Sequence, residues 1–251
     1  RELGLNAPDI DMTDWNQMLT KIHARSREVT IGLVGKYVQL QDAYKSIQES
    51  LTHAAAYSDH KLILTSILSD DITSDNIASL LEGQQGIVVA PGFGNRGVEG
   101  KFIALKYARE NKVPFLGICL GMQMALVEYA ENVLGWKGAN TTEFNANTPY
   151  PIIDLLPDQF TGIKMGGTLR LGDYDCHIED ENSLAYKCYG SHDIKERHRH
   201  RYEFNNQYKS AFESAGMVFS GINPQQNLCE MIELRDHPFF LAAQSHPEFT
   251  S

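Results

Sequence analysis

A cysteine with a glycine two residues away on either side is the feature of this sequence that could do chemistry. Cys119 lies between Gly117 and Gly121, after an apolar segment typical of a strand and before apolar residues at helical spacing. A strand–turn–helix elbow of this kind exposes a nucleophile at the edge of a sheet and leaves no room for a Cβ at its flanks. It also directs the first N–H groups of the helix at the side chain, which favours a thiolate. The motif predicts that Cys119 is a nucleophile rather than the small buried hydrophobe that an isolated cysteine usually is.

A base and an orienting acid are available near the C-terminal end of the sequence. His246 is followed by Pro247, which stiffens the backbone, and then by Glu248. In an extended segment the side chains at positions i and i+2 share a face, so the carboxylate can hold the imidazole in one tautomer. With nine histidines in the chain, a pairing of this kind arises easily by chance, and the interpretation therefore depends on the combination with Cys119. A cysteine, a histidine and a carboxylate together are typical of acyl transfer.

The glycine-rich loop that begins at Pro91 could be a phosphate cradle, a plain turn or an oxyanion hole. It lacks the Gly-Lys-Ser/Thr ending of a P-loop, which argues against nucleotide binding by that route. A tetrahedral intermediate needs N–H donors beside the attacked carbon. Because proline has no N–H, Gly92 is the natural donor in this loop, paired with the N–H of Leu120 directly after the nucleophile.

Arginine and histidine alternate over residues 197–202, which end in a tyrosine. On a strand this pattern puts three arginines on one face and two histidines with the tyrosine on the other. Two histidines without acidic or cysteine ligands beside them make a poor zinc site. The run could be a solvated strand, but we favour anion recognition, in which an arginine holds a substrate carboxylate with two hydrogen bonds.

Strands and helices that alternate along the chain must position these residues. This pattern predicts an α/β fold with an open, mostly parallel central sheet and helices on both faces. The loops after Val89, Ile118 and Ala243 then meet at the carboxyl edge of the sheet, where sites of such folds gather. The expected strands are 30–34, 62–68, 86–90, 113–116, 199–204, 217–220, 231–234 and 239–243, and the expected helices are 42–55, 77–81, 100–110, 120–129, 181–187 and 207–215.

The composition excludes several classes of function. The net charge of −10 over 251 residues argues against nucleic acid as a partner. No apolar run approaches the ~18 residues of a membrane helix, and no signal peptide is evident. The four cysteines have no C-x-x-C spacing, so we expect reduced thiols and a cytoplasmic location. Residues 1–28 are expected to be a linker or N-terminal arm carrying one amphipathic helix, and residues 29–251 to be the main domain.

The motifs resemble a known family. Residues 117–123 with residues 246–248 resemble the class I, triad-type glutamine amidotransferases. More narrowly, four further stretches resemble the glutaminase domain in the CTP synthase branch of that family. They are residues 35–46, 93–101, 165–172 and 197–203, and the likeness extends over about residues 29–251. The amidoligase domain that precedes this one in the family is not part of the sequence, so residues 1–28 resemble the linker between the two domains.

The resemblance implies hydrolysis of glutamine. Cys119 would attack the side-chain amide, His246 would protonate the departing ammonia, and water would cleave the γ-glutamyl thioester. The ammonia would pass to the amidoligase domain, which converts UTP to CTP with ATP. The resemblance implies no cofactor and no metal in this domain, whereas ATP, Mg²⁺ and the effector GTP act on the full-length enzyme, which is expected to be a homo-oligomer.

The resemblance also assigns residues that bind glutamine. Glu143 matches the family's ligand for the α-ammonium group, and Arg201 aligns with its ligand for the α-carboxylate. Phe93 and Arg201 match positions near the GTP site at the domain junction. The remaining residues expected to line the pocket are Gly92, Leu120, Gly121, Met122 and Gln123.

Two positions depart from the family's usual pattern, and three other functions remain open. The family usually has Pro-Gly-Gly-Phe-Gly where this chain has Ala90-Pro91-Gly92-Phe93-Gly94, and it usually has an aromatic residue where this chain has Ser245. Neither change removes a chemical group that the mechanism needs. The alternatives are an amidotransferase of GMP or carbamoyl phosphate synthesis, a γ-glutamyl peptidase, and a catalytically silent module for regulation or assembly.

Overall fold

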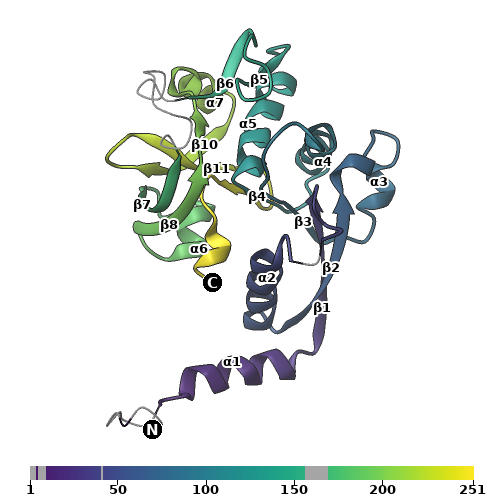
Figure 1. Ribbon diagram of the computed structural model, residues 1–251, viewed down its shortest axis with the longest axis vertical. Helices are drawn as coiled ribbons and strands as arrows, with labels where there is room; N and C mark the ends of the chain where they lie inside the picture. Colours follow the sequence, from purple (N-terminus) through teal and green to yellow (C-terminus); the bar gives the residue numbers. More distant parts are fainter. Residues whose placement is uncertain (1–3, 5–9, 41, 156–168) are drawn as a thin grey trace.

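The chain folds around a nine-stranded sheet (Figure 1), and the computed structural model describes residues 4, 10–40, 42–155 and 169–251. The strand order in this sheet is β2-β1-β3-β4-β12-β11-β10-β7-β8. Its strands are β1 (Arg27–Gly35), β2 (His60–Leu68), β3 (Gly86–Val89), β4 (Phe115–Ile118), β7 (Arg170–Ile178), β8 (Asp193–His200), β10 (Met217–Asn223), β11 (Leu228–Leu234) and β12 (Phe240–Ala243).

The sheet is parallel in one half and antiparallel in the other. Every neighbouring pair from β2 to β12 is parallel, and every pair from β12 to β8 is antiparallel. The α/β fold and its large sheet are confirmed, but the expected parallel pairing holds only for the half of the sheet from β2 to β12. One of the antiparallel pairs has a local cause, because β10 and β11 are joined by the short segment 224–227, and a connection of this length allows only an antiparallel pair.

Helices cover both faces of the sheet. On one face, α4 and α5 pack Leu105 and Met122 into the largest apolar cluster, together with Phe115 of β4. On the other face, α2 packs Ile47 into a cluster that contains Cys119, and α6 belongs to a third cluster beside it. The helices are α1 (Thr13–Ala24), α2 (Lys45–Tyr57), α3 (Ile77–Leu80), α4 (Val98–Glu110), α5 (Leu120–Asn132), α6 (Leu184–Tyr189) and α7 (Lys209–Ser214).

A second sheet beside α5 divides one predicted strand. It contains β5 (Ala139–Thr141), β6 (Tyr150–Leu155) and β9 (Tyr202–Phe204). The strand predicted over residues 199–204 is therefore two strands, β8 and β9, which lie in different sheets and meet at Arg201. Their alternating residues hide the division, since a short break between two strands leaves the pattern of period two almost intact.

The N-terminal helix stands apart from the body of the molecule. Helix α1 projects away from the sheet (Figure 1), and none of its residues is buried. It contacts α2, and β1 begins at Arg27, close to the boundary expected at residue 28. The assignment of residues 1–28 to a linker stays a prediction. Residue 41 of the quoted motif 35–46 and residues 165–168 of the motif 165–172 lie outside the described residues, as do residues 1–3 and 5–9 of the expected N-terminal arm.

Candidate active site

The cysteine elbow is formed where β4 ends and α5 begins. Cys119 has φ 54° and ψ −102°, a conformation that is costly for a residue with a side chain and that concentrates at functional sites. A Cβ on Gly117 would lie 2.8 Å from the Phe115 ring, and a Cβ on Gly121 would overlap the carbonyl oxygen of Val89. The two flanking glycines are therefore required by close approach of neighbouring atoms, as the motif predicts.

His246 and Glu248 lie beside this cysteine. The Nδ1 atom of His246 is 2.9 Å from a carboxylate oxygen of Glu248, and Cys119 interacts with the same imidazole. The backbone N–H of Cys119 donates to the carbonyl of Ala243 at 2.7 Å, which ties the nucleophile to the strand that leads to His246. All three side chains are at least nine-tenths buried.

The backbone that joins the histidine to the glutamate is not extended. Pro247–Phe249 form a 3₁₀ turn, so the sequence argument from an extended segment was wrong about the local conformation. The contact between the imidazole and the carboxylate is present all the same, because the turn folds Glu248 back toward the ring. A second hydrogen bond, from the N–H of His246 to the carbonyl of Arg197 at 2.8 Å, holds this segment against β8.

The surroundings of His246 favour its charged form. Burial alone would disfavour an imidazolium, but hydrogen bonds to Cys119 and Glu248, and the negative charges of both, outweigh it and raise the pKa of His246 to about 10. The imidazole is therefore protonated at neutral pH and has a proton to give to a leaving group.

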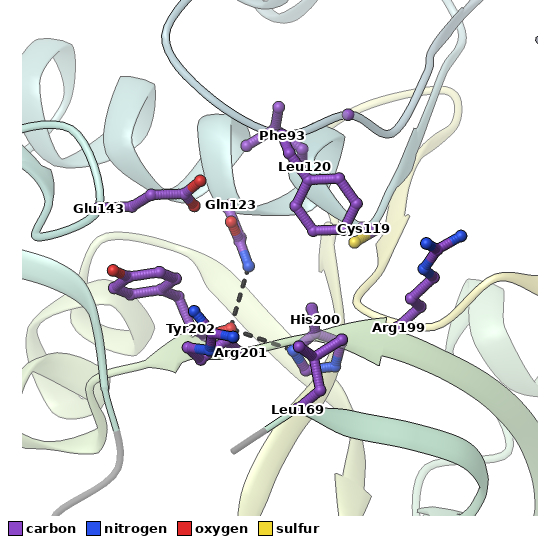
Figure 2. Close-up of a pocket in the computed structure, with 11 residues that line it drawn as sticks. Phe93, Cys119, Leu120, Gln123, Glu143, Leu169, Arg199, His200, Arg201 and Tyr202 are labelled. Carbon is purple, nitrogen blue, oxygen red and sulfur yellow. Dashed lines mark hydrogen bonds between the residues drawn. The ribbon is translucent and has the colours of Figure 1, made fainter. Parts of the chain in front are cut away.

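A cavity of about 250 Å³ lies beside the sulfur atom of Cys119 (Figure 2). Of the eight predicted substrate-binding residues, six line it and two do not: Gly121 and Met122 are buried within α5. Four lining residues were not predicted to be there, namely Leu169, Arg199, His200 and Tyr202, although the last three belong to the alternating run whose arginines were expected to bind an anion. The predicted residues that line the cavity are Gly92, Phe93, Leu120, Gln123, Glu143 and Arg201.

The cavity contains a carboxylate and a guanidinium away from the cysteine. In the view of Figure 2, Glu143 lies on the far side of the cavity from the sulfur of Cys119. Burial raises the pKa of Glu143, while a hydrogen bond from the N–H of Gly94 and the charges of Lys36 and Arg201 act against this rise. A cation that enters would favour the ionised carboxylate further. Opposite charges at this end suit a ligand with an ammonium and a carboxylate group.

Two glutamine side chains connect the cavity to the nucleophile. The Nε2 group of Gln123 donates to the carbonyl of Tyr202 at 3.0 Å and to Oε1 of Gln244 at 3.1 Å. Gln244 in turn donates to the sulfur of Cys119 at 3.7 Å. The family resemblance assigned Gln123 to the pocket, whereas Gln244 was missed, and only its position two residues before His246 could have indicated it.

The two histidines of the alternating run belong to a buried network rather than to a metal site. His198 and His200 form a hydrogen bond at 2.9 Å, and Arg170 behind them forms ion pairs with Glu203 at 3.1 Å and with Glu230 at 2.7 Å. Burial, with the charge of Arg170, lowers the pKa of His198 to about 3. His200 of this network also lines the cavity, as do Arg199 and Arg201 of the same run.

The described ranges contain neither a metal cluster nor a membrane helix. Among residues 4, 10–40, 42–155 and 169–251, no group of three or more histidine, cysteine, aspartate or glutamate side chains could hold a metal ion. In the same part of the chain, no helix has the length and apolar character to cross a membrane.

Comparison with known proteins identifies relatives of the chain. The sequence pattern of the family described as "Glutamine amidotransferase class-I" matches residues 39–251. The CTP synthase of Shouchella clausii (strain KSM-K16) is 53% identical over 249 residues, which are 99% of this chain and 46% of that protein. The chain thus spans about half the length of the curated relatives it matches.

Solved structures are also similar. The glutaminase domain of Trypanosoma brucei CTPS with bound acivicin has a TM-score of 0.82 and 36% identity, over 88% of this chain and 86% of that one. A putative GMP synthase component from Thermoplasma acidophilum has a TM-score of 0.56 at 15% identity, over 89% and 86% of the two chains. At that identity the second likeness concerns the fold alone.

Proposed function

The chain belongs to the class I glutamine amidotransferase family, and from this premise we propose that it hydrolyses L-glutamine to glutamate and ammonia through a thioester on Cys119. The observation that carries the proposal is that Glu143 and Arg201 line the same cavity as the sulfur of Cys119. An amino acid held by these two charged groups would extend its side-chain amide toward the nucleophile.

The proposed mechanism has two halves, formation and hydrolysis of the thioester, and each member of the triad acts in both. The thiolate of Cys119 adds to the amide carbon, and the N–H groups of Gly92 and Leu120 stabilise the oxyanion that forms. The imidazolium of His246 gives its proton to the departing nitrogen, so that ammonia leaves and a γ-glutamyl thioester remains. The now neutral imidazole takes a proton from water, which attacks the thioester and releases glutamate. Glu248 holds the ring and stabilises its charged form.

The role of the chain in a larger enzyme follows from its relatives. We propose that the ammonia is delivered to an amidoligase domain that converts UTP to CTP with ATP and Mg²⁺, in a cytoplasmic homo-oligomer whose interdomain linker includes residues 1–28. GTP would act near Phe93 and Arg201. The exposure of Phe93, at 55%, suits a residue that contacts a ligand or another domain. Glutamine hydrolysis itself needs only the triad, the oxyanion donors and water, so no cofactor is proposed for this domain.

The proposal is tested by the intact mass of the protein after incubation with an electrophilic glutamine analogue. We expect a single adduct that is blocked by free glutamine and absent from Cys119→Ala. Cys188→Ala is the matched control, because Cys188 is an exposed free thiol and its loss should leave the adduct unchanged. Labelling that spreads over other cysteines, or that glutamine fails to block, would mean that no glutamine pocket surrounds Cys119, and the silent regulatory alternative would be preferred.

Arg201→Ala is expected to raise KM for glutamine by about 10- to 100-fold, because a hydrogen-bonded contact to a charged group contributes roughly 1.5–3 kcal/mol. The kcat value should change by less than about threefold, since the α-carboxylate is bound equally in the ground state and the transition state. Steady-state ammonia release measures both constants. Arg235→Ala, which removes an exposed arginine outside the cavity, is the control. An unchanged KM for Arg201→Ala would remove this arginine from the glutamine site.

A further inference from the structure

The loop that carries the proposed oxyanion donor is held through its carbonyl groups. This loop, residues 90–94, follows β3 and leads toward α4, which begins at Val98. Four of its five carbonyl oxygens accept a hydrogen bond from a side chain below the loop. The Nζ group of Lys101 donates to the carbonyl of Ala90 at 2.5 Å. The hydroxyl of Tyr44 donates to the carbonyl of Pro91 at 3.4 Å. The Nζ group of Lys36 donates to the carbonyl of Phe93 and, at 3.0 Å, to that of Gly94.

The three donors are buried, and the proposed chemistry does not use them. Lys36, Tyr44 and Lys101 are 3%, 5% and 0% exposed. A buried ammonium group is costly unless it is paired or hydrogen-bonded, and here the partners are loop carbonyls. Burial, with the charge of Lys36, lowers the pKa of Lys101 to about 7, while the charge of Cys119 acts against this decrease.

Both lysines lie directly beneath Gly92. A Cβ built on Gly92 would be 2.9 Å from Cε of Lys36, 3.6 Å from its Nζ and 3.8 Å from Nζ of Lys101. The glycine at this position is therefore required for the close approach of the lysines, in addition to any freedom that it gives to the loop.

The geometry of a peptide bond links these contacts to the oxyanion donor. The carbonyl of Pro91 and the N–H of Gly92 belong to one peptide unit, and no peptide bond among the described residues is cis. In a trans peptide these two groups point in opposite directions. The hydrogen bond from Tyr44 to the Pro91 carbonyl therefore also fixes the direction in which the Gly92 N–H points.

We propose that Lys36, Tyr44 and Lys101 are positioning residues that hold the carbonyls of loop 90–94 from below and thereby orient the N–H of Gly92 toward the oxyanion. The inference rests on the proposed glutaminase function and adds to it the residues that preorganise the oxyanion hole. Preorganisation matters because a donor that must turn during the reaction loses the advantage of a fixed dipole. None of the three lines the cavity that contains Glu143 and Arg201; they act through the loop.

The test separates binding of the oxyanion from binding of the amino acid. The aldehyde analogue of glutamine, L-glutamate γ-semialdehyde, has the same ammonium and carboxylate groups. When the thiolate of Cys119 adds to its carbonyl carbon, a carbon–sulfur bond forms and the π electrons of the carbonyl move to oxygen, which requires the oxyanion donors. Glutamine binding to a Cys119→Ala protein forms no bond and no oxyanion. The two affinities therefore report on different parts of the site.

Lys36→Met is expected to lower kcat by about 10- to 100-fold, less than or similar to the loss of an oxyanion donor, with KM changed by less than about threefold. Inhibition by the aldehyde should weaken by a similar factor, while the affinity of Cys119→Ala for glutamine stays within about threefold when Lys36→Met is added.

Tyr44→Phe keeps the ring and removes only the hydroxyl, and it should shift kcat and aldehyde inhibition in the same direction by about three- to tenfold. Lys106→Met, which removes an exposed lysine of α4, is the control.

The outcomes of these measurements distinguish a failure of the positioning role from a failure of the proposed function. Selective loss of kcat and aldehyde inhibition in Lys36→Met and Tyr44→Phe supports the proposal. Parallel weakening of aldehyde and glutamine, or two variants that behave as the wild type, overturns it and leaves the glutaminase function intact. If Lys36→Met does not fold, Tyr44→Phe alone decides. A wild-type protein that ignores the aldehyde contradicts the proposed function itself, which is a different failure.

Discussion

Cys119→Ala is expected to abolish glutamine hydrolysis, with a loss in kcat of at least about 10⁴-fold, while the protein keeps its fold. The loss is large because the attacking sulfur is removed, and loss of a triad nucleophile costs about as much as loss of the entire triad. The free energy of unfolding should change by about 1 kcal/mol, because one buried heavy atom is deleted and alanine meets the same backbone conformation at φ 54°. Ammonia release and denaturant unfolding measure the two quantities.

The cysteines elsewhere in the chain provide the comparison for this result. Cys188→Ala, at an exposed free thiol, should retain full activity. Turnover in Cys119→Ala within about tenfold of the wild type would contradict the thioester mechanism. A coincident loss of the unfolding transition would instead show that the variant had not folded, and the adduct experiment on the wild type would then decide the role of the residue.

Glu248→Gln is expected to lower kcat/KM for glutamine by about 10²- to 10⁴-fold, as replacement of the orienting carboxylate does in other triads. The charge of Glu248 and its 2.9 Å hydrogen bond help to raise the pKa of His246 to about 10. Without that charge the pKa of His246 should fall. Since the imidazolium must give a proton to the leaving ammonia, the decrease in activity at alkaline pH should begin at a lower pH in the variant.

The same pKa predicts how stability depends on pH. A histidine whose pKa is raised by folding contributes stability that is fully present below its ordinary pKa of about 6.5. That contribution is lost as the pH rises through about 10. Glu248→Gln should therefore destabilise the protein more at pH 7 than near pH 10. Profiles of kcat/KM and of unfolding between pH 6 and 10.5 measure both effects, with Glu213→Gln on the surface of α7 as the control. An alkaline limit that does not move would contradict the role given to Glu248.

Several features of the fold could be read from local patterns. The order of strands and helices up to α5 follows from apolar residues at periods of two and 3.6, and the observed boundaries are within about three residues of those expected. The elbow could also be predicted from the sequence, since the two glycines of Gly-x-Cys-x-Gly are the residues that its tight turn requires. Gly117 and Gly121 lie against Phe115 and Val89, contacts that every elbow between a strand and a helix must make.

Other features depended on contacts between distant parts of the chain. The division of β8 from β9 at Arg201 is invisible to a pattern of period two, because both strands keep the alternation although they belong to different sheets. The turn after His246 was expected to be extended, and its conformation depends on packing against β8 and α2. Gly121 and Met122 adjoin the nucleophile in sequence, but the helix turns them into the protein and away from the cavity.

By itself, the sequence determined the alternation of strands and helices, the nucleophile and the histidine–carboxylate pair, because each depends on residues within a few positions of one another. Only the tertiary structure decided which residues support them. Lys36 reaches the loop of Gly92 from the residue after β1, and Lys101 reaches it from α4. Gln244, directly after β12, reaches Cys119 across more than a hundred residues of sequence. Such contacts have no local signature, because a lysine or glutamine is usually solvated. Burial beneath a particular loop changes the role of such a side chain, and the packing of the whole chain decides which side chains are buried.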